Sequence, residues 1–203
     1  MKSDRILAYG LLSLLFIVDA VLLFRVFRLQ EEVALKDRII DKITTSRYLA
    51  DCTSTNLNVN YRYGGLPVGD CETEDSAENR CPLNRIVRKP TLVFRYCDRA
   101  CRECISFAAD KLARELENSD IPVVFLARYD NIYEMRRQGP TVNPRGFRMF
   151  NVEKILDLDE KMLPYYCIID GRGAVHDIFI PEKSQPSTTS QYLTGIKNKY
   201  GNI

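Results

Sequence analysis

Tryptophan is absent from this chain of 203 residues, and histidine occurs once, as His176. No charge of one sign dominates, because 29 Lys and Arg residues stand against 27 Asp and Glu residues and leave a net charge of +2. Positive and negative residues alternate along the chain, and neither a basic stripe nor a nucleic-acid-binding motif occurs. We therefore expect no nucleic-acid partner.

Cysteine, in contrast, is abundant, with seven residues, six of which lie between positions 52 and 104. An odd number means that at least one cysteine is unpaired in a monomer or is paired between chains. Such a local density fits an oxidising compartment better than the cytosol. The cysteines are Cys52, Cys71, Cys81, Cys97, Cys101, Cys104 and Cys167.

The N-terminal segment from Ile6 to Phe24 contains 19 residues, of which only Asp19 is charged. A membrane-spanning helix needs roughly 20 mainly apolar residues. A secretory signal has a shorter apolar core and small residues at its cleavage site, and no A-x-A pattern follows here. We therefore predict an uncleaved transmembrane anchor within residues 1–28, with a cleaved signal as the alternative. Asp19 is expected near one end of the span or in contact with a neighbouring anchor helix.

The residues that flank this span give opposing indications of its orientation. More basic residues follow it than precede it, a bias that by itself leaves the C-terminal domain inside. The cysteine content favours the opposite orientation, and we give it more weight. We therefore expect the soluble domain in the periplasm or outside the cell. The basic residues are Lys2 and Arg5 before the span, and Arg25, Arg28, Lys36 and Arg38 after it.

Helical character continues through residues 29–48, which we predict to form a stalk. Apolar residues recur at spacings of four and three, as in a coiled-coil seam that contains one lysine. The pattern covers only about three heptads, the lower limit for a coiled coil. Both a plain stalk helix and a zipper that joins two chains in a homodimer fit it. The seam consists of Leu22, Val26, Leu29, Val33, Lys36, Ile40 and Ile43.

Residues 49–89 are polar and rich in turn-forming pairs, so we predict a linker or accessory segment without long elements. The stretch NLNVNYRY, residues 56–63, alternates in character and predicts a short strand, with Gly64-Gly65 as the turn after it. The acidic run from Glu72 to Glu78 is predicted to be a solvated loop.

Cys71 and Cys81 bracket this acidic loop, which favours a disulfide between them. Their Cα atoms should then lie within about 7 Å of each other. Metal binding is the weaker alternative, because these cysteines lack C-x-x-C spacing and the chain has a single histidine. We expect no metal and no other cofactor.

From residue 90 onward the pattern indicates a compact α/β domain. The expected order is strand, helix, strand, helix, strand, strand, helix, and the two last strands are joined by a Gly171-Arg172-Gly173 turn. The first strand leads directly into a C-x-x-C motif, and the helix after it has one apolar stripe. The segments are TLVFRY (91–96), ISFAADKLARELE (105–117), IPVVFLARY (121–129), NIYEMRRQ (131–138), YYCIID (165–170), AVHDIFI (174–180) and STTSQYLTGIKNKY (187–200).

This order, together with the segments LVFRYCDRACREC and LPYYCIIDGRGAV, resembles the thioredoxin superfamily. It is most similar to the membrane-anchored bacterial thiol-disulfide oxidoreductases and redoxins of the TlpA type. The resemblance covers residues 90–203 and implies a central mixed sheet flanked by helices. It also implies that Pro164 is a cis-proline beside the motif, although cis bonds occur in only about 5–6% of X-Pro pairs.

The chemistry of the motif follows from its position at the start of a helix. The unpaired N–H groups and the dipole of a helix N-terminus favour a thiolate. Because the thiolate is the attacking species, Cys101 is the expected nucleophile and Cys104 the resolving thiol. Arg99 or Arg102 should add to the stabilisation of the thiolate, and Glu103 should oppose it.

The chain differs from thioredoxin at several points around this motif. Ala100 replaces the aromatic residue that usually precedes the first cysteine, and a charged pair, Arg102-Glu103, replaces Gly-Pro. Arg95 occupies roughly the strand position at which thioredoxin keeps a buried acid. Cys97 lies in an apparent insertion of two residues, and Cys167 is predicted to be a small core residue.

The leading functional hypothesis is thiol-disulfide exchange on exported proteins, with protein thiols and disulfides as partners. The alternative is a non-catalytic thioredoxin-like binding or scaffold domain in which Cys101 and Cys104 form a structural disulfide. Thiol peroxidase activity is a third hypothesis, but RYCDRAC lacks the Pro-x-x-x-Thr/Ser stretch that precedes the reactive cysteine of such enzymes.

Overall fold

The computed structural model describes residues 2–68 and 71–201, apart from the side chains of residues 2–18, 20, 21, 41 and 44–49. The chain divides into two units, Met1–Thr53 and Ser54–Ile203. One helix, α1 (Lys2–Tyr63), runs through the first unit and continues into the second.

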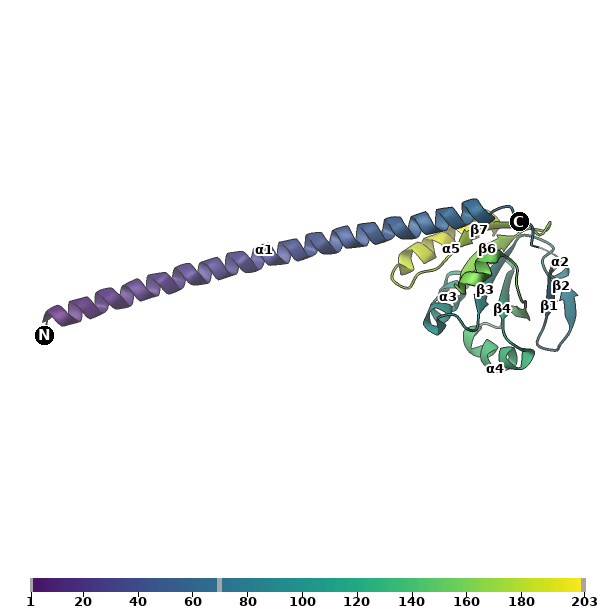
Figure 1. Cartoon of the computed structure of the whole chain (residues 1–203), viewed down its shortest axis with the longest axis horizontal. Coiled ribbons are helices and arrows are strands. Elements are labelled where there is room, and N and C mark those ends of the chain that lie inside the picture. Colours follow the sequence, from purple (N-terminus) through teal and green to yellow (C-terminus); the bar gives the residue numbers. More distant parts are fainter. Residues whose placement is uncertain (1, 69–70, 202–203) are drawn as a thin grey trace. The chain divides into compact units, whose positions relative to one another are not determined.

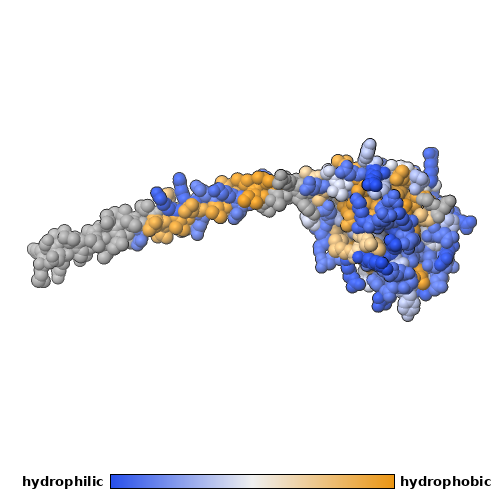
Figure 2. All heavy atoms as spheres, in the orientation of Figure 1, coloured by the Kyte–Doolittle hydropathy of each residue, from blue (hydrophilic) through white to orange (hydrophobic). Residues whose placement is uncertain are grey.

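The first unit consists of α1, so the helical character predicted for the anchor and the stalk is confirmed. Between residues 22 and 43 the large apolar side chains are 49–66% exposed, and Figure 2 shows them along the described part of the helix. Of the predicted span, only Asp19 and Leu22–Phe24 have described side chains, and the remainder lies outside the described residues. Within the described part of the chain, no helix combines the length and apolar character needed to cross a bilayer.

The second unit is built on a seven-stranded mixed sheet (Figure 1). Its strands are β1 (Glu72–Glu74), β2 (Arg80–Pro82), β3 (Thr91–Cys97), β4 (Val123–Arg128), β5 (Arg148–Asn151), β6 (Tyr165–Ile169) and β7 (Val175–Phe179). They are arranged in the order β2-β1-β5-β4-β3-β6-β7. β3, β4 and β5 run parallel, whereas β6 is antiparallel to β3, and β7 to β6. The four strands predicted for this domain are confirmed.

Strands β3, β4, β6 and β7 and the three longer helices that lie among and after them follow from their sequence patterns. All seven residues of β3 are buried, as expected of a central parallel strand. Helix α3 (Arg102–Glu115) follows β3 and buries one face through Ile105, Ala108 and Leu112. The remaining helices of the unit are α2 (Leu83–Ile86), α4 (Ile132–Val142), the short 3-10 helix η1 (Asp157–Lys161) and α5 (Pro186–Tyr200).

Two hydrophobic cores lie on the two faces of the sheet. Residues of α3, α4 and α5 pack on one face around Phe94 and Tyr166. The opposite face is covered by α2, η1, the loop between β5 and η1, and the C-terminal end of α1. The sheet is therefore buried on both faces, which holds β3 and the motif that follows it in a rigid frame.

The strand predicted for NLNVNYRY is wrong, because residues 56–63 form the last two turns of α1. Asn56, Val59, Asn60 and Tyr63 recur at helical spacing, and Val59 and Tyr63 enter the core. Asn60 Oδ1 accepts a hydrogen bond from the Ile178 amide at 2.7 Å, and Asn56 Oδ1 accepts one from the Ile180 amide at 2.7 Å. The asparagines thus take part in pairing the backbone near the β7 edge of the sheet.

The region from Glu72 to Glu78, predicted to be a loop, begins with strand β1 and continues into the turn before β2. The hairpin pairs Thr73 with Cys81. The turn is stabilised by the Asp75 carboxylate, which accepts bonds from the backbone amides of Ala77 at 2.8 Å and Asn79 at 2.9 Å. The hairpin adds to the sheet through Glu74 and Asn151.

Candidate functional site

The C-x-x-C motif occupies the turn between β3 and α3. The Asp98 amide donates to the Arg128 carbonyl, which continues the β3–β4 ladder by one residue, and the Ala100 amide then closes a turn onto the Cys97 carbonyl. Cys101 is the N-cap of α3, and its carbonyl accepts from the amides of Cys104 and Ile105, both at 3.0 Å. The predicted helix start next to Cys101 is therefore confirmed.

The two thiols of the motif face each other. Cys104 Sγ lies 2.6 Å from Cys101 Sγ and donates to it, and the Cys104 amide lies 3.4 Å from the same sulfur. Cys101 is exposed and Cys104 is half-buried, as predicted. Two sulfur atoms at this separation need little movement to form a disulfide.

The environment of the pair separates the acidities of the two thiols. The pKa of Cys101 is lowered, first by the hydrogen bond from the Cys104 thiol and then by the backbone amides of Cys104 and Glu103, while the Glu103 carboxylate opposes this shift. The pKa of Cys104 is raised to about 11, because its thiol donates to Cys101 and because it is partly buried. Cys101 is thus the thiol that ionises first, as its place at the helix N-terminus requires.

Charged side chains around the pair are arranged differently from the sequence-based prediction. Arg99 does not act on the thiols as a free cation, because its guanidinium is bound to the Asp130 carboxylate at 2.6 and 2.7 Å. Glu103 opposes the thiolate, as predicted. Sequence reasoning missed Lys183, which lies between β7 and α5 and forms an ion pair with Glu103. Lys183 is the basic side chain that lowers the pKa of Cys104, against the effects of the Cys101 hydrogen bond and of burial.

Pro164 lies at the same end of the sheet as the motif. Pro164 directly precedes β6, whose first residue, Tyr165, pairs with Arg95 near the end of β3. The predicted cis bond before Pro164 is wrong, because no cis peptide bond occurs among the described residues. The chain instead enters β6 through Met162, whose φ of 51° lies in the left-handed region and turns the backbone before a trans X-Pro bond. A catalytic role for Pro164 remains a prediction.

Arg95, which occupies roughly the strand position at which thioredoxin keeps a buried acid, is held in a buried network. Its guanidinium contacts Asp159 Oδ2 at 2.9 Å and donates to the Val152 carbonyl at 2.8 Å and the Glu153 carbonyl at 2.9 Å. The Asp159 carboxylate also accepts from the Ile155 amide and the Tyr165 hydroxyl, both at 2.8 Å. The network joins β3, η1 and the start of β6 behind the motif.

Cys97, predicted to lie in an insertion after the strand, is the last residue of β3. Cys71, Cys81 and Cys167 take no part in the turn that carries the motif. The predicted disulfide between Cys71 and Cys81 is not formed in this structure. Cys81 faces Thr73 in the hairpin, whereas the Cys71 thiol donates to the Lys154 carbonyl at 3.1 Å, so the two sulfurs have different partners. Cys167 is fully buried, and burial raises the pKa of its thiol, as expected of a core residue.

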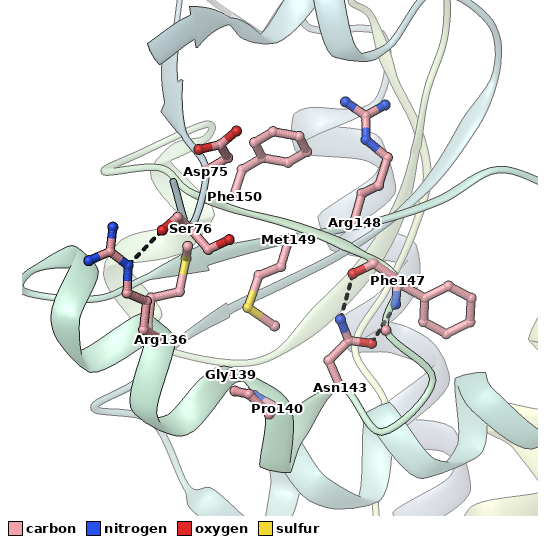
Figure 3. A pocket seen from close by; sticks show the side chains of 12 residues that line it. Asp75, Ser76, Arg136, Gly139, Pro140, Asn143, Phe147, Arg148, Met149 and Phe150 are labelled. Atoms are coloured by element: carbon pink, nitrogen blue, oxygen red, sulfur yellow. Dashed lines mark hydrogen bonds between the residues drawn. The ribbon is translucent and has the colours of Figure 1, made fainter. Parts of the chain in front are cut away.

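A separate hollow of about 620 Å³ lies between α4, β5 and the β1–β2 hairpin (Figure 3). Its wall is largely apolar, with Met135, Phe147, Met149 and Phe150, and Arg136 is fixed at its edge by the Ser76 carbonyl at 2.6 Å. None of the cysteines lines it. The hollow is therefore a feature of the α4 face and forms no part of the thiol site.

Among the described residues, no group of three or more His, Cys, Asp or Glu side chains is placed to hold a metal ion. The second unit has a thioredoxin-like fold. Its core strands β3, β4, β6 and β7 lie in the order β4-β3-β6-β7, with α3 between the first two and α5 after the last. The C-x-x-C motif stands at the N-terminus of the first of these helices.

Comparison with solved structures finds the following proteins to be similar to this chain. A thiol:disulfide interchange protein from Bacteroides sp. is 14% identical over 68% of this chain and 95% of its own, with a TM-score of 0.45. Peroxidoxin BcpB from Mycobacterium tuberculosis is 14% identical over 66% and 97%, with a TM-score of 0.47. A secreted disulfide oxidoreductase of Mycobacterium tuberculosis is 11% identical over 62% and 96%, with a TM-score of 0.45. No protein-family model and no curated protein sequence matches the chain.

Proposed function

We propose that this protein is a thiol-disulfide oxidoreductase that acts on exported proteins through Cys101 and Cys104. One observation carries the proposal, namely the paired thiols at the N-cap of α3. The exposed Cys101 thiol has a lowered pKa, and a partner thiol with a raised pKa lies 2.6 Å away. An exposed thiol of low pKa beside a resolving cysteine is the arrangement that thiol-disulfide exchange needs.

The reaction proceeds in two exchanges. The Cys101 thiolate attacks one sulfur of a substrate disulfide, a mixed disulfide forms on Cys101, and the other substrate sulfur leaves as a thiolate. The Cys104 thiolate then attacks Cys101 Sγ, the bond to the substrate breaks, and the second substrate sulfur leaves. The substrate is reduced by two electrons and the Cys101–Cys104 pair is oxidised by two. The reverse sequence oxidises a substrate dithiol.

An insulin-reduction assay on the full chain in detergent, with dithiothreitol as electron donor, tests this activity. We expect turnover by the unmodified protein, loss of turnover in Cys101→Ser, and unchanged turnover in Cys81→Ser, which removes a thiol outside the motif. A protein that is folded but inactive, with the Cys101–Cys104 disulfide resistant to dithiothreitol, would instead support the scaffold alternative.

We further propose that the N-terminal helix anchors the protein in a membrane, with the second unit in the periplasm or outside the cell. The apolar run from Ile6 to Phe24 and the cysteine content support this location. The full chain should sediment with membranes, whereas a chain that starts at residue 29 should not. Labelling of Cys101 in intact cells by a membrane-impermeant thiol reagent would establish the orientation, and failure to label would reverse it.

The stalk seam supports a homodimer as part of the same proposal. One core position of the seam is β-branched throughout, with Val26, Val33 and Ile40. The other position holds two leucines, one lysine and one isoleucine: Leu22, Leu29, Lys36 and Ile43. β-Branched residues at the first position with leucine at the second favour two-stranded coiled coils. A Val33→Asp variant should sediment as a monomer in detergent if the seam pairs. An unchanged sedimentation coefficient would show that the seam does not join two chains and that the segment is a plain stalk helix.

A further inference from the structure

Lys183 tethers the segment between β7 and α5 to the first turn of α3. Its ammonium donates to the carboxylate of Glu103, a residue 80 positions earlier in the chain and situated between the two motif cysteines. Both side chains are open to solvent, at 50% exposure for Lys183 and 78% for Glu103. An exposed ion pair of this kind contributes little to stability, so its position beside the thiols is the more informative feature.

The positive charge of Lys183 acts on the motif thiols. The pKa of Lys183 is raised, chiefly by the Glu103 carboxylate and further by the nearby thiolates of Cys104 and Cys101. At Cys104 the hydrogen bond to Cys101 and partial burial raise the pKa, and the charge of Lys183 works against them. Glu103 acts in the opposite direction on both thiols.

The effects on the pKa of Cys104 change once a substrate is bound to Cys101. In the mixed disulfide the Cys101 sulfur carries no negative charge, so the hydrogen bond that most disfavours ionisation of Cys104 is lost. Burial and Glu103 still disfavour the Cys104 thiolate, while Lys183 favours it. Arg99 forms its ion pair with Asp130, whereas Lys183 forms its own with Glu103, which lies between the two motif cysteines.

We propose that Lys183 is a positioning residue for the second exchange and promotes the attack of Cys104 on the mixed disulfide. This inference rests on the proposed function. In the step, Cys104 loses its proton to solvent, its thiolate forms a bond to Cys101 Sγ, and the bond between Cys101 and the substrate sulfur breaks. The substrate leaves as a thiolate, and Lys183 remains protonated throughout.

Stopped-flow reaction of the reduced full chain with dithiodipyridine separates the two exchanges. This aromatic disulfide is neutral, so Lys183 does not attract it. Attack by Cys101 releases one thiopyridone, and attack by Cys104 on the resulting mixed disulfide releases a second. A Cys104→Ala variant lacks the second phase, and a Cys101→Ala variant lacks both and gives the background from the other thiols.

We expect Lys183→Gln to slow the second phase about three- to tenfold at neutral pH and to shift its pH profile to higher pH. Loss of the positive charge raises the pKa of Cys104, and each unit of pKa changes the fraction of Cys104 that is thiolate about tenfold. The first phase should change by less than about twofold, since the charge acts mainly on Cys104. Lys183→Arg should retain most of the rate. High salt should slow the unmodified protein toward Lys183→Gln.

Lys199→Gln is the matched control, because it removes a lysine from another exposed pair, with Asp177 at 2.8 Å, away from the thiols. An unchanged second phase in Lys183→Gln would overturn the inference. Equal slowing in Lys183→Gln and Lys183→Arg would also overturn it, because the charge would then not matter. Failure of the proposed function itself would appear differently, as the lack of a fast first phase in the unmodified protein.

Discussion

The buried Arg95–Asp159 ion pair allows a quantitative prediction of how much it contributes to the stability of the domain. The two side chains are only 2% and 3% exposed. Removing one partner of a buried ion pair costs about 3–5 kcal/mol, because the other charge is left without compensation. Asp159→Asn leaves the guanidinium with only neutral acceptors, among them the carbonyls of Val152 and Glu153. For a domain of this size each kcal/mol lowers Tm by about 2–4 °C, so we expect a decrease of about 6–20 °C.

Urea unfolding of Asp159→Asn, Arg95→Met and the double variant measures this effect. The decrease in the free energy of unfolding should be smaller in the double variant than the sum of the decreases in the two single variants, because the two residues belong to one network. Glu117→Gln is the control, since it breaks the exposed pair with Arg145 and should cost less than about 1 kcal/mol. Single variants that each lose less than about 1 kcal/mol would show that the network does not hold β3 and η1 together.

Three further predictions concern single side chains. Iodoacetamide at neutral pH should alkylate Cys101 well before Cys104, because the pKa of Cys101 is lowered and that of Cys104 is raised; equal rates would refute the asymmetry. Asn60→Ala should lower the free energy of unfolding by about 1–2 kcal/mol and speed up hydrogen exchange at the Ile178 amide, because the Asn60 side chain accepts a hydrogen bond from this amide. An unchanged exchange rate would show that the hydrogen bond does not protect this edge of the sheet. Cys167→Ser should lower the free energy of unfolding, measured in urea, by about 1–3 kcal/mol, because the new hydroxyl would be buried among apolar side chains. An unchanged free energy of unfolding would contradict the apolar surroundings of Cys167.

The parts of the fold that could be predicted are those with strong local patterns. The continuous apolar run of β4 and the single stripe of α3 reflect burial on two faces and on one face, respectively. The start of α3 at Cys101 was predictable because a C-x-x-C at a helix N-terminus has a local cause, the set of unpaired amides there. The same reasoning gave the correct order of exposure of the two thiols.

The accessory region was not predictable in the same way. The stretch NLNVNYRY satisfies an alternating pattern and a helical one, and tertiary contacts favour the helix because Val59 and Tyr63 reach the core. The strands of the β1–β2 hairpin are only three residues long and carry polar residues, so they have little signal of their own. Their formation depends on pairing with each other and with β5.

At the site, the contacts missed from the sequence are those between distant positions. Lys183 reaches Glu103 across 80 residues, and Asp159 reaches Arg95 across 64. No spacing rule relates such positions. The cis bond at Pro164 was inferred by analogy, and the left-handed Met162 provides another route into β6. The substitution of Arg95 for an acid was visible in the sequence, but its partner was not.

The redox potential of the Cys101–Cys104 pair tests the central claim most directly. The full chain would be equilibrated in buffers of reduced and oxidised glutathione, and the two thiols would be quantified by alkylation and mass spectrometry. A thiol-disulfide oxidoreductase should equilibrate with glutathione and give a potential between about −270 and −120 mV, the range of known exchange proteins. A pair that stays oxidised at every ratio, with a potential below about −300 mV, would be a structural disulfide and would contradict the account.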